Sequence, residues 1–161
     1  MVQVTLAELT DWPAIWPIFH AVVAEGNTYA FAPDIAEADA LLIWMTPPAR
    51  CYIARVEEQI VGTCIIKPNQ PGLGDHVANA AFMVVQDQSG QGIGRALGHF
   101  ALDESRRLGF VAIKVHYVVS TNHRAIKLWQ SLGFAIVGQV PQAFRHQQHG
   151  LVDVYVMHRF L

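Results

Sequence analysis

The chain has 161 residues, 52% of them apolar and 15% charged, so it can bury a substantial core, and wholesale disorder is excluded. Its formal net charge of −2 provides no positive field that would gather nucleic acid. No apolar run approaches the ~20 residues of a membrane span, and the first residues lack the pattern of a signal peptide. The two cysteines, Cys51 and Cys64, exclude a disulfide framework. We therefore expect a soluble cytoplasmic protein.

Hydrophobic periodicity predicts the element order β-α-α-β-β-β-α-β-α-β-β, without repeats or linkers, and hence one α/β domain over residues 1–161 with a mixed sheet. The segment 77–85 is almost entirely apolar, so it is expected to be a central strand. A polar loop is predicted over 142–150. The predicted strands cover 2–6, 51–56, 60–66, 77–85, 112–119, 135–140 and 151–159, and the predicted helices run from Thr10 to Gly26, from an Asp34 cap to Trp44, and over 92–108 and 122–132.

The densest chemical signal is a glycine-rich turn, Ser89-Gly-Gln-Gly-Ile-Gly-Arg95, which follows a buried strand and opens a helix. Glycines let the backbone approach an anion, and the free N–H groups of a first helical turn bind it. The turn therefore predicts a phosphate or pyrophosphate site, although the same glycines can serve the turn alone. A P-loop is excluded because no Gly-Lys-Ser/Thr occurs, and a Rossmann site because the next strand, within 111–118, carries no acidic residue.

Two segments together resemble the GCN5-related N-acetyltransferase (GNAT) family. Phe82-Met-Val-Val-Gln-Asp-Gln-Ser-Gly-Gln-Gly-Ile-Gly-Arg-Ala-Leu97 is similar to the acetyl-CoA loop of that family, and Thr121-Asn-His-Arg-Ala-Ile-Lys-Leu-Trp-Gln-Ser-Leu-Gly-Phe134 is similar to its second motif. The two motifs occur in the family's order, with a strand between them. The resemblance implies a GNAT fold, a mixed and mostly antiparallel sheet of about seven strands flanked by about four helices. It also implies acetyl-CoA as co-substrate and no metal.

The resemblance implies that the strand 77–85 splays from the next strand and that the pantetheine of acetyl-CoA lies in this gap, bonded to the backbone near 82–84. The family usually has Arg or Gln where this chain has Ser89, a change that leaves the backbone N–H groups intact. The tyrosine that often serves the family as general acid is replaced by Trp129, whose indole cannot protonate a thiolate. The cofactor-binding residues that the resemblance implies are Phe82, Met83, Val84, Gly90, Gln91, Gly92, Ile93, Gly94, Arg95, Asn122 and Trp129.

A narrower resemblance concerns the acceptor. His76-Val-Ala-Asn-Ala-Ala-Phe-Met-Val84, the Asn122 motif and the ending Phe144-Arg-His…Leu151-Val-Asp-Val-Tyr155 are similar to the fungal proline-analogue N-acetyltransferases, which detoxify azetidine-2-carboxylate. It implies that Asn79 and Asn122 are catalytic and hold the substrate or the reacting carbonyl. From the residues alone, Asn79 can equally be an asparagine satisfied by backbone. Asn122 can be a helix N-cap, a role that is compatible with ligand contact.

The acceptor pocket is expected to contain Asn79 and three residues of the loop between the first two helices, Thr28, Tyr29 and Phe31, although ordinary loop packing would also explain these three. Arg145 and His146 are further candidates for contact with an acceptor carboxylate. No general base is assigned, because His76, His116, Glu25, a water relay and an amine that is already neutral are all open.

The predicted function is transfer of the acetyl group from acetyl-CoA to a small amino or imino acid by direct attack on the thioester. The alternatives are an acetyltransferase for a protein N-terminus, a polyamine or an antibiotic, and a non-catalytic acyl-CoA sensor. The expected partner is a small-molecule amine, with neither nucleic acid nor membrane. A homodimer is compatible with such a sheet.

Overall fold

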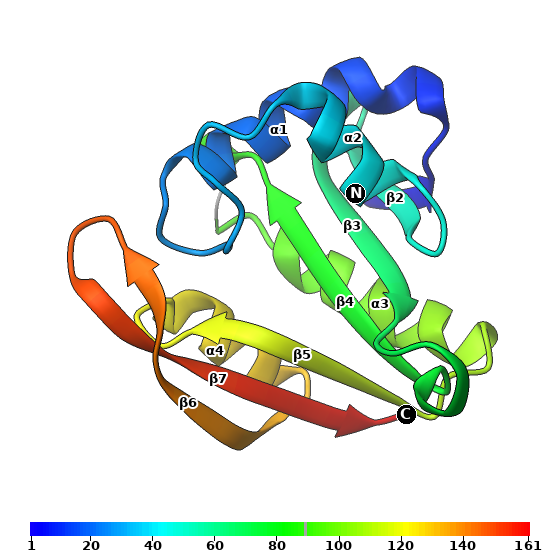
Figure 1. Cartoon of the computed structure of the whole chain (residues 1–161). Helices are drawn as coiled ribbons and strands as arrows, with labels where there is room; N and C mark the ends of the chain where they lie inside the picture. The colour runs from blue at the N-terminus through cyan, green and yellow to red at the C-terminus, as the bar shows by residue number, and fades with distance from the viewer. Residues whose placement is uncertain (89) are drawn as a thin grey trace.

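The computed structural model describes residues 1–88 and 90–161, and its centre is a seven-stranded sheet (Figure 1). The sheet order is β1-β2-β3-β4-β5-β7-β6, and every neighbouring pair is antiparallel except β4 and β5. The strands are β1 (Val2–Leu6), β2 (Arg50–Val56), β3 (Gln59–Pro68), β4 (Val77–Val84), β5 (Ala112–Val119), β6 (Ala135–His146) and β7 (Gly150–Phe160). The α-helices are α1 (Trp12–Ala24), α2 (Glu37–Met45), α3 (Ile93–Arg107) and α4 (His123–Ser131). The predicted fold class is confirmed, and β4 is central as expected.

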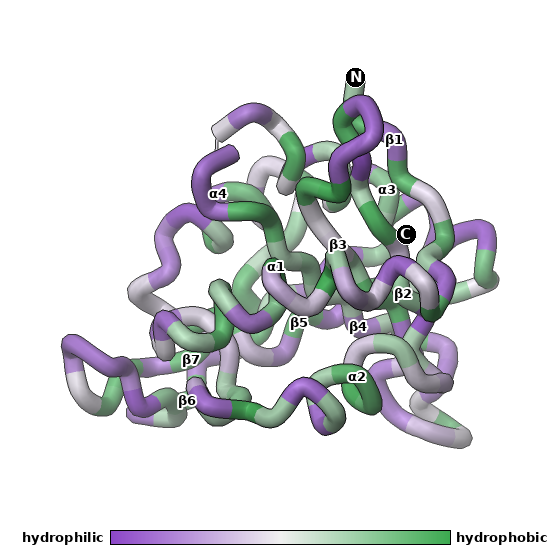
Figure 2. The backbone as a smooth tube through the Cα atoms, turned by 90° about the horizontal axis from the view of Figure 1, so that it is seen from above, coloured by the Kyte–Doolittle hydropathy of each residue, from purple (hydrophilic) through white to green (hydrophobic). Residues whose placement is uncertain are grey.

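The two faces of the sheet are covered by different helices. Met83 and Ile65 pack with α1 and α2, whereas Ala80 packs with α3 and α4 on the opposite face. Successive residues of β4 thus point to opposite faces, and both faces are buried, which explains its nearly continuous apolar sequence. In Figure 2 hydrophobic residues follow the strands through the middle of the molecule, whereas the turn between β6 and β7 is hydrophilic. Within the described ranges, no helix is long and apolar enough to cross a membrane.

The parallel strands β4 and β5 stay paired over a short stretch only. Their register consists of Val77 with Ala112 and Ala78 with Ile113, after which the strands diverge (Figure 1). The N–H of Val85 donates to Val61 at 3.0 Å, on the β3 side. Because backbone groups alternate in direction along a strand, residues an odd number of positions from Val85 direct theirs away from β3. Ala80, Phe82 and Val84 therefore present their N–H and C=O groups to the gap.

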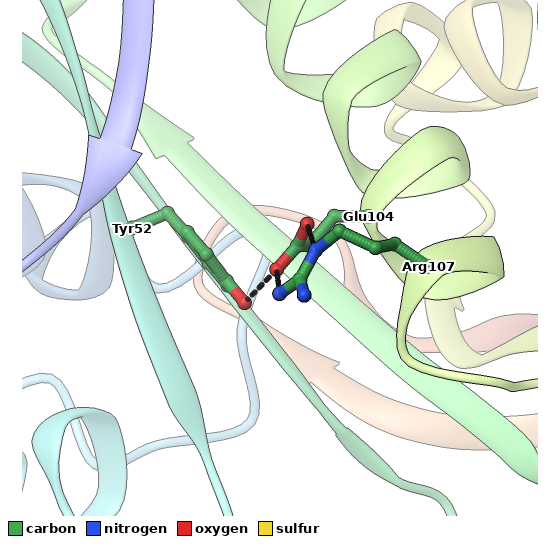
Figure 3. Close-up of polar contacts among 3 residues, drawn as sticks. All are labelled: Tyr52, Glu104 and Arg107. Atoms are coloured by element: carbon green, nitrogen blue, oxygen red, sulfur yellow. Dashed lines mark hydrogen bonds and ion pairs between the residues drawn. The ribbon is translucent and has the colours of Figure 1, made fainter.

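A polar contact ties α3 to the sheet beneath it (Figure 3). The hydroxyl of Tyr52 on β2 donates to Glu104 at 2.8 Å, and Arg107 donates two hydrogen bonds to the same carboxylate, at 2.7 and 2.6 Å. The hydrogen bonds from Arg107 are the main reason why the pKa of Glu104 lies below its usual range. The contact is therefore maintained at neutral pH, and it fixes the helix that carries the glycine turn at its other end.

The predicted start of the second helix is wrong. α2 begins at Glu37 with Ala36 as its N-cap, and Asp34 lies before it. The chain first makes a separate turn, in which the N–H of Ile35 donates to the C=O of Ala32 at 2.9 Å. Ile35 packs against the cluster beneath α1 and α2, so tertiary contact decides the boundary over the capping preference of Asp34.

The predicted polar loop over 142–150 is also wrong in its first half. β6 continues to His146, because Phe144 turns inward and is 5% exposed. The polar residues before it lie at an irregularity between Val140 and Phe144, where Gln142 has a φ of +51°. This is a bulge in an edge strand, which has the polar composition of a loop while the strand pairing continues on either side.

Candidate functional site

A cavity of about 500 Å³ opens where β4 and β5 diverge. It brings together residues of the α1–α2 loop, β4, the glycine turn and α4. The predicted site residues that line it are Thr28, Tyr29, Phe31, Asn79, Phe82, Met83, Val84, Gly90, Ile93, Gly94, Asn122 and Trp129. Gln91, Gly92 and Arg95 belong to the same turn without lining the cavity, and Ser89 lies outside the described residues.

The glycine turn ends as the N-terminus of α3. Gly90 and Gly92 have φ values of +94° and +81°, a left-handed backbone that favours glycine. Beyond the chain neighbours, the described residues place no atom within 4 Å of a Cβ added to either glycine. Gly92 is the N-cap and supplies no side chain, so the N–H groups of the first turn of α3 remain available. Together with the helix dipole, they form a site for an anion.

The α1–α2 loop closes one side of the cavity with two aromatic rings. The hydroxyl of Tyr29 donates to the C=O of Phe82 at 2.8 Å, in the gap beside β4. Burial raises the pKa of this phenol far above its usual value, so Tyr29 stays a neutral donor. Its ring stacks on Phe31 with 6.0 Å between ring centroids and 6° between planes. These contacts fix the loop on β4 beside the cavity.

Asn79 lies on β4 near the point of divergence and is 6% exposed. Its Nδ2 donates to the C=O of Lys114 and to Nδ1 of His116, each at 3.0 Å. Since a carbonyl can only accept, this contact fixes which end of the amide faces β5. Both amide hydrogens are thus engaged, and Oδ1 has no hydrogen-bond partner in the described part of the chain. Asn79 can therefore accept a further N–H through Oδ1, but it has no amide hydrogen left to donate.

The same contact fixes the tautomer of His116. Because Nδ1 accepts from Asn79, the proton of the neutral ring lies on Nε2. Partial burial, with Lys114 and Lys67 nearby, lowers the pKa of His116 below its usual 6.5. At neutral pH, His116 therefore offers an N–H donor, and its basic nitrogen is already occupied.

We expect ¹⁵N NMR of the side chains at pH 7 to show His116 with a bare Nδ1 and a protonated Nε2. Its titration midpoint is expected below 6.5, the ordinary histidine value. Since the folded-state pKa is depressed, His116 stabilises the fold less as the pH falls through 6.5 toward that midpoint. Asn79→Ala, which removes the bond to the neutral ring, should move the midpoint upward. A midpoint at or above 6.5 in the wild type would contradict the assigned contacts.

Asn122 caps α4 and lines the cavity at the same time. Its Oδ1 accepts from the N–H of Ala125 at 3.2 Å, as predicted for an N-cap. The cap uses only this oxygen, and neither amide hydrogen has a partner among the described residues, so both can meet a ligand. The structure therefore allows both roles that the sequence left open.

Asn122→Ala and Asn122→Asp separate these two roles. Alanine removes the cap, which we expect to lower the free energy of unfolding by about 1 kcal/mol, whereas aspartate retains a capping oxygen. Neither variant keeps the amide donor. If that donor contacts the ligand, both variants lose turnover by about tenfold or more, although only alanine loses stability. Thermal unfolding and steady-state kinetics measure the two effects, and full turnover in Asn122→Asp would remove the amide from the reaction.

Trp129 forms an apolar wall. It is buried, and its ring lies 4.9 Å from that of Phe82 and 4.7 Å from that of Phe134, measured between centroids. Arg145 and His146 line a neighbouring hollow of about 570 Å³, which shares Tyr29 and Phe31 with the cavity. His146 is buried there and accepts at Nδ1 from the N–H groups of Gln148 and His149. Arg145 is exposed, and both residues line this hollow rather than the cavity itself.

The charged residues of the cavity are mostly cationic. Lys67 and Arg124 line it, and the acidic residue of its lining, Glu25, is hydrogen-bonded by the amide of Gln86. Sequence reasoning missed Lys67, although it is a charged residue at the end of an otherwise largely apolar strand. Among the described residues, no group of three or more His, Cys, Asp and Glu residues is arranged to hold a metal ion.

Comparison with known proteins identifies the family. The acetyltransferase (GNAT) family matches residues 12–134. N-acetyltransferase aca1 of Schizosaccharomyces pombe is 34% identical over 126 residues, which cover 78% of this chain and 54% of that protein, so the chain spans about half of its relative. A GCN5-related N-acetyltransferase from Kribbella flavida is 46% identical with a TM-score of 0.94, covering 99% of this chain and 98% of that one.

A more distant structure is that of yncA from Salmonella typhimurium, determined with its cofactor acetyl-CoA. It has a TM-score of 0.87 at 21% identity and covers 100% of this chain and 94% of that one, a likeness that concerns the fold. The family match and the two closer relatives agree with the glycine turn and the divergent strands. The chain belongs to the acetyltransferase (GNAT) family of enzymes.

Proposed function

We propose that this enzyme transfers the acetyl group of acetyl-CoA to the amine of a small amino or imino acid of the proline-analogue type. The observation that carries the proposal is the cavity between β4 and β5. At one end it meets the anion site of the glycine turn, and at the other it holds Asn79, whose Oδ1 is left without a partner in the described part of the chain. The aromatic wall of Tyr29 and Phe31 makes the acceptor end small.

The residues of the cavity fit acetyl-CoA in three parts. The N-terminus of α3, with Gly90 and Gly92, suits the pyrophosphate, and Arg124 adds a positive charge. The N–H groups that β4 presents to the gap suit the amide-containing pantetheine arm and the thioester oxygen. Trp129 and Phe82 provide an apolar wall. When bound, acetyl-CoA supplies an activated acyl group.

The chain's own residues then place the amine. Asn79 Oδ1 accepts one amine N–H, which directs the nitrogen lone pair toward the thioester carbon. The C–N bond forms and the C–S bond breaks, while N–H donors of β4 stabilise the charge that develops on the carbonyl oxygen. The amine proton leaves to water, and coenzyme A departs as thiolate or thiol. His116 is not the base in this scheme, since its free nitrogen already carries a proton.

Several finer assignments belong to the same proposal. Cys51 and Cys64 are free and buried, which agrees with a reducing cytoplasmic location. The similarity to N-acetyltransferase aca1 supports an N-acetylating activity. Detoxification of amino-acid analogues is the physiological role that a proline-analogue acceptor would imply. A homodimer remains compatible with the exposed edge strand β6.

The test is acetyl-CoA-dependent release of thiol across an acceptor panel. The panel contains azetidine-2-carboxylate, phosphinothricin, methionine-derived amino acids, a polyamine, an aminoglycoside and short peptides. Turnover of a small amino or imino acid, with the polyamine and peptides at least tenfold poorer in kcat/KM, is the expected result. Preference for a peptide N-terminus or a polyamine would refute the proposed acceptor. Binding of acetyl-CoA without turnover of any acceptor would favour a sensor.

A further inference from the structure

Two basic side chains, Lys67 and His116, lie on either side of Asn79, and the reaction described above uses neither of them. Lys67 on β3 is the register partner of Asn79 on β4, so the two side chains are neighbours on one face of the sheet, with Cβ atoms about 5 Å apart. His116 is hydrogen-bonded to Asn79 from the other side of the gap. Lys67 and His116 both line the cavity. A positive charge and an N–H donor thus flank the atom that would hold the amine.

Lys67 is half-buried and has no ion pair among the described residues. The three ion pairs of the described residues lie elsewhere. One joins Arg55 to Asp11, and the other two lie within α3. The charges of Lys67 and Lys114 act on His116, where they help to lower the pKa of the imidazole. An ammonium group that is partly removed from water and lacks a counter-charge favours an anionic ligand.

His116 adds a hydrogen-bond donor of defined direction to this positive end of the cavity. Asn79 holds its Nδ1, so the donor is Nε2–H, and the ring is neutral at pH 7. A neutral N–H donor beside an ammonium group suits a carboxylate, which accepts at two oxygens. The acid in the cavity lining, Glu25, accepts a hydrogen bond from Gln86 and forms no ion pair with Lys67 in the described part of the chain.

We propose that Lys67 and the Nε2–H of His116 bind the carboxylate of the acceptor and thereby select free amino and imino acids. This inference rests on the proposed function and specifies how the acceptor is recognised. In an α-amino or α-imino acid, one carbon separates the amine from the carboxylate. An amine on Asn79 Oδ1 therefore brings the carboxylate to the neighbours of Asn79. A polyamine, which carries only positive charge, is repelled by Lys67.

The test compares azetidine-2-carboxylate with its carboxamide, which keeps the amine but has no negative charge. Lys67→Met is expected to raise KM for the carboxylate by about 10- to 100-fold, the usual range for a lost charge-assisted hydrogen bond. Its KM for the carboxamide and for acetyl-CoA should stay within about threefold of wild type. Lys67→Arg should recover most of the loss. Lys127→Met makes the same change at an exposed position of α4 outside the cavity lining and should change neither acceptor's KM.

His116→Leu and His116→Gln extend the comparison to the second donor. Leucine removes the N–H and should raise KM for the carboxylate selectively, whereas glutamine can restore a donor. These variants also keep the inference testable if thermal unfolding shows that Lys67→Met does not fold. A loss that is equal for carboxylate and carboxamide, or no loss in the folded Lys67→Met and His116→Leu proteins, would overturn the carboxylate site.

The wild-type enzyme separates this inference from the proposed function. If it acetylates peptides or polyamines but neither azetidine-2-carboxylate nor any other free amino or imino acid, the proposed function fails, and the carboxylate site fails with it. If it acetylates azetidine-2-carboxylate and the folded variants lose nothing selectively, the proposed function stands and only the carboxylate site is overturned.

Discussion

Asn79→Ala is expected to lower kcat by about 100-fold or more, with KM for acetyl-CoA within about threefold of wild type. The reason is geometric, because the proposed mechanism uses Oδ1 of Asn79 to hold the amine, and both hydrogens of its amide are engaged on β5. Loss of a group that aligns a nucleophile typically costs about this factor. Steady-state kinetics with the acceptor found in the panel measures both constants.

The same variant also affects stability, which must be separated from catalysis. Alanine leaves the Lys114 carbonyl and Nδ1 of His116 without their partner, so the free energy of unfolding should fall by about 1–3 kcal/mol. Asn69→Ala, directly after β3 and outside the cavity lining, is a control for loss of an asparagine side chain from this hairpin. Folded Asn79→Ala enzyme that keeps wild-type kcat would remove Asn79 from the reaction.

Local signals in the sequence were sufficient for most of the fold. β1 and β5 have their predicted bounds, and α4 begins immediately after its predicted cap, Asn122. Errors occurred where a distant contact decides the structure. Asp34 is a good capping residue by type, but Ile35 packs on the core and moves the helix start to Glu37. At the 142–150 segment, burial of Phe144 extends a strand through polar residues.

The candidate site likewise has one part that local sequence predicts and another that depends on distant contacts. The anion site at the glycine turn is local, since one short segment contains both the glycines and the helix N-terminus that follows them. The basic group around Asn79 is not local. Lys67 joins Asn79 only through the β3–β4 register, and His116 joins it only through an irregular stretch of β5, where pairing with β7 shifts between Val115 and Val118. Neither the register nor the irregularity is encoded in a short motif. Sequence reasoning therefore gives His116 only as one of several candidate bases and misses Lys67.

Gly92→Val is expected to weaken acetyl-CoA binding by about 30-fold or more. The Cβ of residue 92 would enter the space in front of the glycine turn, where the described residues beyond its chain neighbours place no atom within 4 Å and where the proposed pyrophosphate would lie. Valine also strains a backbone whose φ is +81°, at a cost of about 1–3 kcal/mol in stability. Isothermal titration calorimetry with acetyl-CoA gives the affinity, and thermal unfolding gives the stability.

Gly109→Val separates crowding of the ligand from backbone strain. Gly109 follows the other end of α3 and has a φ of +88°, and again no atom of the described residues beyond its chain neighbours lies within 4 Å of an added Cβ. Both variants should therefore lose a similar amount of stability, but Gly109→Val should bind acetyl-CoA like wild type. Equal affinities in the two variants would show that the anion does not lie at the turn. A loss confined to Gly92→Val would mean that the free N–H groups of α3 bind the cofactor, because the two glycines differ in the end of the helix they border and not in their strain.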